Sequence, residues 1–599
     1  VALAQQQKAK VLTSELLEEA YQSVIAKMSL SEDERPQYDA RFRSTAEAAT
    51  RLSPVICETF FGKAEAEAKG SGRLLLLAFN PDACQGCQLC ISSCPEDALV
   101  AYDRAGTVRE DAQLGWKVWE QLPDTPGAVI DKVGEDLDLG RLAARFLSRH
   151  SSQVQAVGSF GEPGSGERLA CRMVTGLVEA QFQKRLADRA GEATDLGGQL
   201  NARVQELLAK GLTDADSKSI QNALETLPRH RVSLSDLSER LSKLGKSVWL
   251  DPVKTLRLAQ VAHELQSEAW NLTEGVNRLG RSRFGVVVLS HRIARWAGRF
   301  PNHPYNAPLV VEPSPEGAGL AVGLAEAQAL KHTDQIRRVR KARLLLENPS
   351  DLPGRLAELE ELTWGGLTEA ERASCVPLLM LADESALTRQ GLGVLTRLLT
   401  GNLPVKLVLL DSRPLTLGIP EPALLGLSLG STFVLSSSLG YARHLADGLD
   451  QAMAHPGPAL VHIHVPIPQE QGFEPIQTLD RARLAVQARV QPLLRYDPRG
   501  EGVFGLRLSL EGNPGIDSKW GGTDPLQWAL GEGRFSGLFG AASEDERTVP
   551  WEEYLTLDPT ERRDSVPSTT DPSGKVWKVD PRLAEAAGRR LEVWDTLRE

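Results

Sequence analysis

The feature that most constrains the fold is an alternation of short apolar runs with helical segments between residues 285 and 470. Each run is continuously apolar, which is typical of a strand buried on both faces of a parallel sheet with helical crossovers. We therefore expect an α/β domain built on a parallel sheet. Its predicted strands are 286–289, 376–381, 405–410 and 459–464, and its predicted helices include 388–399 and 441–454.

The segments around this core have other patterns. A Gly-rich turn at 159–167 precedes a predicted helix at 168–186, and residues 187–280 contain polar, Leu-punctuated amphipathic helices that we interpret as an insertion. A further helix is expected at 15–28, and a short apolar strand is expected at 74–79, before the cysteine run. The chain closes with an irregular, Pro-rich and charged stretch that ends in a helix at 581–597.

Size and charge exclude several classes of function. The 599 residues are 41% hydrophobic, which is enough for several packed domains. The net charge of −11 is distributed along the chain and forms no basic stripe, so we expect no nucleic-acid partner. The longest apolar stretches, such as 423–439, are interrupted by Gly, Ser and Thr and fall short of a membrane span. We expect a soluble, cytoplasmic protein.

Four of the seven cysteines lie within eleven residues, at Cys84, Cys87, Cys90 and Cys94, and Pro95 follows them. An odd total with this crowding is a poor disulfide framework and a good metal site. The spacing is that of bacterial ferredoxins, whose thiolates bind a [4Fe–4S] cluster, whereas zinc favours two separated cysteine pairs. The sequence therefore predicts one [4Fe–4S] cluster and electron transfer through it.

The fourth ligand of this cluster has two candidates. In two-cluster ferredoxins the cysteine before the proline ligates the other cluster, and the fourth thiolate comes from an earlier run. The sequence has no earlier run, but Cys57 lies where the last cysteine of such a run would fall. Either Cys57 completes the cluster and Cys94 is left without one, or Cys94 serves locally. The sequence leaves both assignments open.

The cysteine run and three later motifs occur together in one known family. With them, the chain resembles the C-terminal half of pyruvate:ferredoxin oxidoreductase, in the 2-oxoacid oxidoreductase family. That half contains a ferredoxin domain and the domain that binds the diphosphate of thiamine diphosphate. The similar segments are 79–95 (FNPDACQGCQLCISSCP), 492–499 (PLLRYDPR), 516–519 (IDSK) and 532–535 (EGRF).

The resemblance implies a domain order. We expect a parallel-sheet α/β domain of the thiamine-diphosphate-binding type, preceded by a ferredoxin-like α+β cluster domain. The expected segments are an N-terminal helical or linker segment at 1–70, the ferredoxin-like domain at 71–110, a linker at 111–150, the thiamine-diphosphate-type domain at 151–540 with its insertion at about 187–280, and a C-terminal tail at 541–599.

A second cluster, next to the thiamine, would be held in this family by four cysteines. Their positions correspond here to Glu162 and Ser165 in the Gly-rich turn, to the vicinity of Arg292, and to the vicinity of Ile467. None of these residues is a cysteine, and side chains of these types do not hold an iron–sulfur cube. The resemblance therefore implies that this cluster has been lost.

The thiamine site implied by the resemblance is partly retained. The family's Gly-Asp-Gly, whose Asp binds Mg²⁺, reads ADE here with Asp383 at its centre, and its Asp-Thr reads DS with Ser412 keeping the hydroxyl. Glu384 adds charge and bulk where a glycine lets backbone approach the diphosphate, and a later Asn-Thr-Gly-Gly reads TLGI at 416–419. Mg²⁺ on a diphosphate needs oxygen ligands and close backbone approach. These replacements argue against thiamine diphosphate and Mg²⁺ as cofactors.

Other candidate residues have plainer interpretations. His462 and His464 alternate along one strand and share a side, but without a third ligand we expect core or interface histidines. Cys171 and Cys375 are isolated in apolar surroundings, where we expect small buried side chains. The basic run 337–343 has acids nearby and no interleaved aromatic residues, so we interpret it as a solvated helix face.

Two functions remain. In the first, the chain is an iron–sulfur electron-transfer subunit, or half, of an oxidoreductase assembly of this family, with a non-functional thiamine site. In the second, it is the catalytic half of a 2-oxoacid:ferredoxin oxidoreductase, for oxidative decarboxylation. The expected partners are other oxidoreductase subunits or N-terminal domains of the same family, a ferredoxin or flavodoxin-type electron carrier, and further copies in an oligomer.

Overall fold

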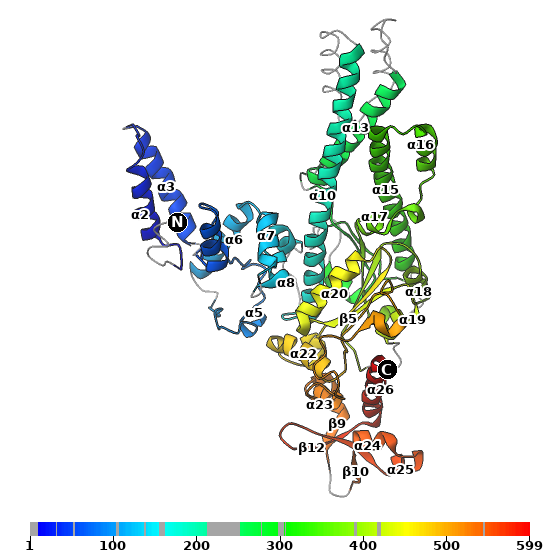
Figure 1. The fold of residues 1–599 in the computed structure, drawn as a ribbon. Helices are drawn as coiled ribbons and strands as arrows, with labels where there is room; N and C mark the ends of the chain where they lie inside the picture. Colours follow the sequence, from blue (N-terminus) through cyan, green and yellow to red (C-terminus); the bar gives the residue numbers. More distant parts are fainter. Residues whose placement is uncertain are drawn as a thin grey trace. The chain divides into compact units, whose positions relative to one another are not determined.

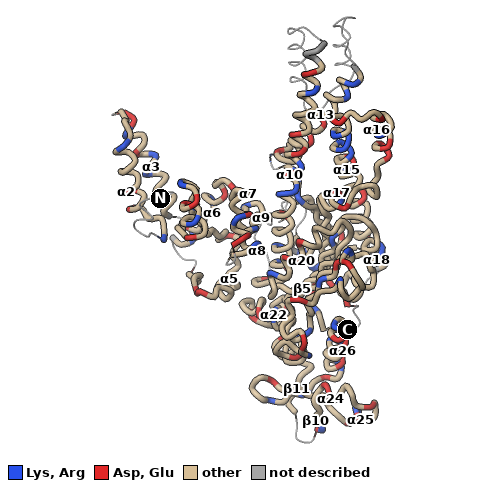
Figure 2. Tube along the Cα trace, viewed as in Figure 1, with Lys and Arg blue, Asp and Glu red and all other residues tan. Residues whose placement is uncertain are grey.

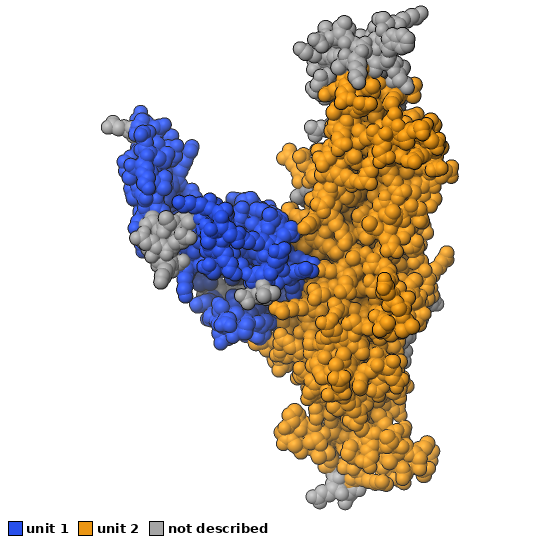
Figure 3. Space-filling model, viewed as in Figure 1, with its two compact units in different colours: residues 1–149 blue, residues 150–599 orange. Residues whose placement is uncertain are grey.

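The computed structural model describes residues 10–31, 33–51, 54–103, 107–136, 139–154, 162–211, 252–276, 278, 280–297, 305, 307–314, 316–387, 392–415, 421–542 and 546–599. They belong to two compact units, unit 1 at Val1–Arg149 and unit 2 at His150–Glu599 (Figure 3). Two segments from the sequence analysis, the motif at 416–419 and the middle of the predicted insertion at 212–251, lie outside the described residues.

Unit 1 is largely helical. The helices α2 and α3 lie side by side, with the rings of Tyr21 and Phe42 stacked at 4.0 Å and the Tyr21 hydroxyl donating to Asp39 at 2.6 Å (Figure 1). The elements are α2 (Ser14–Ile25), α3 (Glu34–Arg51), the π-helix η1 (Glu58–Gly62), α4 (Lys63–Glu67), α5 (Leu89–Ser92), α6 (Thr107–Gln121), α7 (Gly127–Gly134), α8 (Gly140–Arg145) and, across the unit boundary, α9 (Arg149–Gln153).

The strand predicted before the cysteine run is not formed. Leu75 contributes a single antiparallel bridge to Val55, and Val55 makes a second bridge to Val11. A strand needs neighbours along its length to pair its backbone, and the rest of the predicted strand finds none among the described residues. The ferredoxin-like segment therefore has less regular structure than we expected.

The segment expected as a linker in unit 1 contains helices. Residues 111–150, predicted as a linker, form most of α6 together with α7 and α8. Their apolar residues recur at helical spacing, and Val133 and Ala144 become buried. The N-terminal segment, expected to be helical or a linker, contains α2 and α3.

An eight-stranded sheet forms the centre of unit 2, in the order β2-β1-β3-β4-β6-β5-β7-β8. The strands from β2 to β5 in this order are parallel, whereas β7 is antiparallel to β5 and β8 to β7. The strands are β1 (Gly285–Val288), β2 (Leu309–Val311), β3 (Leu378–Asp383), β4 (Val405–Asp411), β5 (Phe433–Ser438), β6 (Ala459–His464), β7 (Leu494–Tyr496) and β8 (Leu508–Ser509).

The parallel α/β prediction is confirmed, and the four predicted strands are β1, β3, β4 and β6. Every residue of β3, β4 and β6 is buried, because helices cover both faces of the sheet. The helices around it are α14 (His291–Ala297), α15 (Glu316–Glu347), α16 (Leu352–Glu360), α17 (Glu369–Ala373), α18 (Leu392–Thr400), α19 (Pro422–Ser428), α20 (Ala442–Ala454), α21 (Pro468–Gln471), α22 (Thr478–Gln487) and α23 (Pro525–Leu530).

The register of the sheet aligns the ends of its central strands. Asp411 at the end of β4 pairs with His464 at the end of β6, and His464 also pairs with Ser438 at the end of β5. Asp383 ends β3 and pairs with Leu410 of β4. Polar side chains from separate parts of the sequence therefore meet at one edge, which we call the carboxyl edge: the ends of β3, β4, β5 and β6.

The insertion begins within one long helix. The helix α10 (Gly166–Gly211) continues without a break from the Gly-rich turn, and at 46 residues it is about 69 Å long. It packs against α13 (Pro252–Thr273) through Leu196, Leu200, Leu258 and Leu265 (Figure 1). A Cβ on Gly197 would lie 3.4 Å from the carbonyl oxygen of Ala262, so a glycine permits the close approach of the two helices.

The C-terminal residues are not an irregular tail. They form a second sheet, in the order β10-β11-β12-β9, together with α24 (Trp551–Thr556), α25 (Pro559–Arg563) and α26 (Pro581–Arg598). Leu583, Ala584 and Ala587 of α26 share a core with Trp528 and Trp551, so apolar burial orders this region. Its strands are β9 (Phe539–Ala541), β10 (Thr548–Pro550), β11 (Val566–Thr570) and β12 (Val576–Val579).

Charged residues of both signs are interspersed in both units (Figure 2). In the basic run on α15, Arg337 bonds to Asp334, Arg340 to Glu371 and Arg343 to Glu192. These pairs agree with a helix face whose charges are matched by acids. Within the described residues, no helix has the length and apolar character that crossing a bilayer requires.

Candidate functional site

The cysteine run forms a tight, mostly irregular loop in unit 1. The carbonyl oxygen of Asn80 accepts from the amides of Ala83 and Cys84 at 3.2 and 3.1 Å, which starts a turn before the first thiol. Gly86 and Gln88 then have φ values of +68° and +61°. This left-handed backbone is costly for a glutamine and reverses the chain between successive thiols. The run then enters the single helical turn of α5.

Cys94 lies just after this helical turn. Its amide donates to the carbonyl of Ile91 at 3.0 Å, and its sulfur accepts a hydrogen bond from the amide of Ala98 at 3.3 Å. Amide hydrogen bonds to a cysteine sulfur stabilise negative charge on it and help to set the potential of a bound cluster. The hydrogen bond from the Ala98 amide would therefore stabilise a thiolate at Cys94.

The thiols of the run suit an iron–sulfur cluster in number, spacing and accessibility. Cys84 and Cys90 are exposed, and Cys87 and Cys94 are half-buried. Among the residues that the structure describes, no three His, Cys, Asp or Glu side chains converge closely enough to hold a metal ion. The run supplies four thiols at the spacing of a 4Fe–4S binding domain, and metal binding by such thiols is generally coupled to local folding.

The alternative ligand Cys57 lies on the other side of the bridge between Val55 and Leu75. Because this bridge is antiparallel, the chain from Val55 to Cys57 and the chain from Leu75 towards Cys84 leave it in opposite directions. Cys57 instead begins the π-helix η1, where its carbonyl oxygen accepts from the amide of Phe61 at 2.9 Å. Where it leaves this bridge, the chain at Cys57 therefore runs away from the direction taken by the chain towards Cys84.

The second set of candidate residues lies at the carboxyl edge of the sheet in unit 2. Asp383 ends β3 and Ser412 follows β4, and both are buried. Asp383 accepts from the hydroxyl of Ser290 at 2.5 Å and from the amide of Ser385 at 3.0 Å. The structure therefore brings the two predicted residues to one site, but each is already engaged by the chain.

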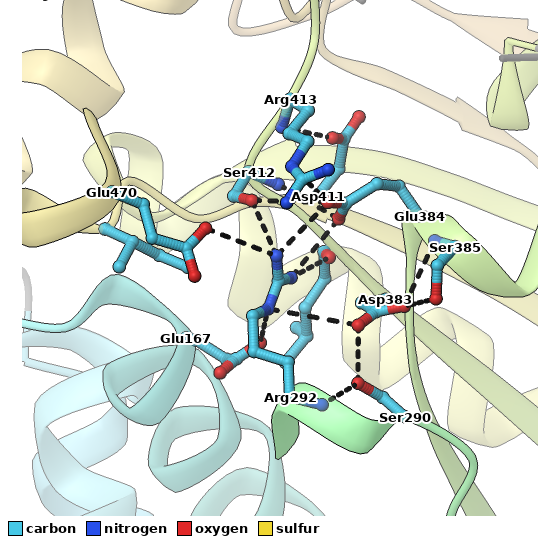
Figure 4. A network of polar contacts seen from close by, with 12 residues as sticks. Glu167, Ser290, Arg292, Asp383, Glu384, Ser385, Asp411, Ser412, Arg413 and Glu470 are labelled. Carbon is cyan, nitrogen blue, oxygen red and sulfur yellow. Dashed lines mark hydrogen bonds and ion pairs between the residues drawn. The ribbon is translucent and has the colours of Figure 1, made fainter. Parts of the chain in front are cut away.

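Arg292, at the start of α14, lies at the centre of this site (Figure 4). Its Nε lies 2.9 Å from Glu167 and 3.9 Å from Asp383. Its terminal nitrogens lie 3.1 and 3.2 Å from the two carboxylate oxygens of Glu384, and one of them donates to the hydroxyl of Ser412 at 2.8 Å. This bidentate pairing is the strong, directional geometry of arginine with carboxylates. We call these five residues the Arg292 network.

The ionisation of the Arg292 network follows from burial and charge. Burial opposes the charge of Arg292, but Glu167, Glu384 and Asp383 together hold its pKa above the ordinary value. Burial, with the charge of nearby Asp411, raises the pKa of Glu384, while Arg292 opposes this shift. The guanidinium is therefore permanently charged and stabilises the ionised form of the carboxylate that faces it.

Asp411 is held by a different set of contacts. Its Oδ2 lies 3.1 Å from Nε2 of His462, and its Oδ1 accepts from the amide of Arg413 at 2.7 Å. Burial opposes ionisation, but the hydrogen bond and charge of His462 hold the pKa of Asp411 below its ordinary value. His464 bonds through Nδ1 to the Asp411 carbonyl at 3.2 Å, and burial lowers the pKa of His464 to about 4.

Both histidines are completely buried, which agrees with core residues rather than a metal pair. The two isolated cysteines, Cys171 and Cys375, are buried as predicted. Burial also raises the pKa of the Cys375 thiol to about 12, so this sulfur stays protonated and unreactive at neutral pH.

The four positions at which the family has its second set of cysteines also come together. The amide of Gly166, next to Ser165, donates to the carbonyl of Pro466, next to Ile467, at 2.9 Å. Glu162 is close enough to Arg292 and Glu470 for their charges to act on it. These positions therefore lie near one another in the folded chain, although none of them is a cysteine.

The carboxyl edge does not fit Mg²⁺ and thiamine diphosphate. A glutamate, Glu384, occupies the position where backbone would approach phosphate, and it accepts hydrogen bonds from Arg292. A diphosphate placed there would meet buried carboxylates, and a Mg²⁺ ion would meet a guanidinium. The chain itself supplies the cation that these carboxylates require.

Sequence reasoning missed two residues that complete this site. The carbonyl of Ser412 accepts from Nε2 of Gln471 at 2.6 Å and from Arg534 at 2.8 Å. Arg534 belongs to the EGRF motif of the resemblance, which was the available signal, whereas nothing near Gln471 in the sequence marks it. Arg292 was noted only as a missing cysteine, because its charge pairs with residues more than 90 positions away.

Comparisons with known proteins agree with the cysteine spacing. A family model described as 4Fe-4S binding domain matches residues 77–100, which contain Cys84, Cys87, Cys90 and Cys94. No curated protein sequence matches the chain. Residues 77–100 are therefore similar to 4Fe–4S binding domains, and this similarity points to an iron–sulfur electron-transfer role.

Proposed function

We propose that this chain is the iron–sulfur electron-transfer component of an oxidoreductase assembly, with one [4Fe–4S] cluster bound by Cys84, Cys87, Cys90 and Cys94. The observation that carries the proposal is the match of a 4Fe–4S binding domain to residues 77–100, which include the entire cysteine run. When bound, the cluster supplies reversible one-electron chemistry. The chain contributes the thiols, and Ala98 contributes an amide hydrogen bond to one of them.

We further propose that the assembly is of the 2-oxoacid oxidoreductase type and that unit 2 is a thiamine-type domain used as a scaffold. Two features support this. The parallel sheet has Asp383 and Ser412 at its carboxyl edge, and the four positions of the lost cysteines lie close together beside it. The Arg292 network then takes the place of the cofactors, because its guanidinium lies 3.9 Å from Asp383 and donates to the hydroxyl of Ser412, the two residues that would hold Mg²⁺.

The competing function is the catalytic half of a 2-oxoacid:ferredoxin oxidoreductase, completed by a partner chain. The meeting of Asp383 and Ser412 at one edge favours it. The bonds of Ser290 and Ser385 to Asp383, and of Arg292 to Ser412, count against it because both candidate ligands are already engaged. A cofactor would have to displace buried ion pairs to bind.

A cofactor assay on anaerobically purified full chain separates the two functions. The electron-transfer proposal expects about four irons and four sulfides per chain, a reducible cluster signal in electron paramagnetic resonance, and no bound thiamine diphosphate. Stoichiometric thiamine diphosphate would contradict the scaffold role of unit 2. A chain reconstituted with iron and sulfide that binds neither would contradict the electron-transfer role itself.

The fourth ligand is tested by a matched pair of variants. Cys94→Ala should lose the cluster or convert it to a three-iron form, whereas Cys57→Ala should retain about four irons and an unchanged spectrum. The reverse result would assign the ligand role to Cys57. Cys171→Ala serves as the control because this cysteine is completely buried in unit 2.

A further inference from the structure

The helix α15 has an apolar face that is not covered by the described part of unit 2. One side of the helix packs Ala318, Ala321 and Ala325 against the central sheet. The opposite side exposes Leu320, Leu324 and Leu330, with exposed fractions of 43%, 37% and 64%. Three exposed leucines within eleven residues of one helix form a patch of the kind that marks an interaction site.

The spacing of this face is that of a helix–helix seam. Leu320, Gly323, Ala327 and Leu330 follow one another at intervals of three, four and three residues, and all four are exposed. This 3-4-3 repeat keeps residues on one stripe facing a partner helix. A Cβ on Gly323 would meet nothing within 4 Å. Since glycine weakens a helix relative to alanine and this one relieves no contact inside the chain, a close-packed partner helix would account for it.

The charged residues on either side of this stripe indicate what kind of helix could pack against it. Glu326 flanks the seam on one side and Lys331, five residues later, flanks it on the other; both are exposed. Neither forms an ion pair within the described residues. The largest charge effect on Lys331 comes from Arg281, which has the same sign and lowers the pKa of Lys331. Glu268 acts on Lys331 in the opposite sense, but this carboxylate is ion-paired with Arg189 and Arg338.

We propose that the α15 seam (Leu320, Gly323, Ala327 and Leu330) pairs two copies of this chain, with the two helices parallel. In a parallel pair, each flank of one helix faces the opposite flank of the other, so Glu326 of one copy meets Lys331 of the second, twice by symmetry. In an antiparallel pair centred on this seam, Glu326 would meet Glu326. The charge pattern is therefore complementary to a second copy in one orientation.

Sedimentation of the purified full chain tests this pairing. The wild type should be a dimer, and Glu326→Lys or Lys331→Glu should each raise the dimer dissociation constant at least tenfold. The double variant should restore it, and an equimolar mixture of the two single variants should associate as well as the wild type. Both substitutions are on the surface, so thermal unfolding should show that each variant is folded.

A control substitution lies on the same helix. Glu347→Lys makes the same change of charge at an exposed position away from the seam and should leave association unchanged. A monomeric wild type would overturn the proposal. So would a dimer that is insensitive to Glu326→Lys, or a double variant that stays dissociated. The last result would indicate that any pairing through this helix is not parallel.

Discussion

The cysteine run and the Arg292 network both contain ionisable side chains, but the two sites differ in how far these side chains are buried and held by the rest of the chain. In the run, two thiols are exposed, the backbone is largely irregular, and no described set of side chains converges on a metal. In the network, one guanidinium contacts Glu167, Asp383, Glu384 and Ser412 within 4 Å, and all four are buried. In the function that we propose, a bound cluster completes the first site, whereas the chain itself supplies the contacts of the second.

The scaffold role that we propose for unit 2 follows from this difference, since an arginine would take the place of a cofactor while the fold is kept. Buried carboxylates at the end of a parallel sheet need a cation, and either a metal or an arginine satisfies that need. An arginine requires no supply of cofactor and fixes the surrounding elements permanently.

The largest expected effect is that of removing iron. Chelation should raise amide hydrogen exchange across residues 77–100 about a hundredfold or more, because metal binding and local order are coupled. Peptides that cover β3, β4 and β6 should be unchanged. Exchange measured by mass spectrometry before and after chelation checks this. If chelation raised amide exchange equally in residues 77–100 and in the peptides of the central sheet, the two sites would not differ in their dependence on metal.

Substitution of Arg292 by methionine should have the next largest effect. It leaves three buried carboxylates without their counter-charge, which costs about 3–5 kcal/mol of unfolding free energy. Arg413→Met is the matched control. Arg413 pairs with the same Glu384 at 3.3 Å, but its side chain is 56% exposed, so its loss should cost less than about 1 kcal/mol.

Denaturant unfolding of both arginine variants gives the two values. A second substitution, Glu384→Gln, should recover part of the loss in the Arg292→Met background because it removes one of the uncompensated charges. If Arg292→Met and Arg413→Met lower the unfolding free energy by similar amounts, burial does not strengthen the contacts of Arg292. The Arg292 network would then contribute no more to stability than a surface ion pair.

A smaller effect concerns pH. Burial raises the pKa of Glu532 to about 7, with Arg534 at 2.6 Å opposing the shift. A carboxyl whose pKa is higher folded than unfolded binds more protons in the native state. Its contribution to stability is therefore present below about pH 4.5 and is lost as pH rises through 7. Glu532→Gln should flatten this dependence.

At pH 8 the Glu532→Gln variant should be more stable than the wild type by about 2 kcal/mol, and the difference should vanish near pH 5. Unfolding free energies measured across this range provide the check. A variant that is less stable than the wild type at pH 8 would show that the ion pair with Arg534 outweighs the burial of Glu532.

The smallest expected effect is that of a partly exposed ion pair between α15 and α16. Lys341 lies 3.3 Å from Glu360, whose side chain is 61% exposed. Lys341→Met should change the unfolding free energy by no more than about 0.5 kcal/mol, and 1 M salt should reduce even this difference. A cost comparable to that of Arg292→Met would contradict the ranking of these sites by burial.

Much of the central sheet could be predicted because its signal is local. The strand β6 has the predicted bounds, and β4 differs from its prediction by one residue, since both are continuous apolar runs. The strand β5 was missed because it ends in three serines. They are buried only through distant partners: Ser436 donates to the Pro492 carbonyl and Ser438 to the Ala482 carbonyl. No local pattern contains that information.

By itself, the sequence determined the cysteine spacing, the apolar strands and the presence of Asp383 and Ser412, because each is a property of a short stretch of chain. Only the tertiary structure decided what surrounds them. Arg292 lies 125 residues from Glu167 and 92 from Glu384, and their meeting depends on the strand order that brings separate chain ends to one edge. Charge pairing inside a protein is decided by proximity in space, and proximity at such separations is a property of the folded chain.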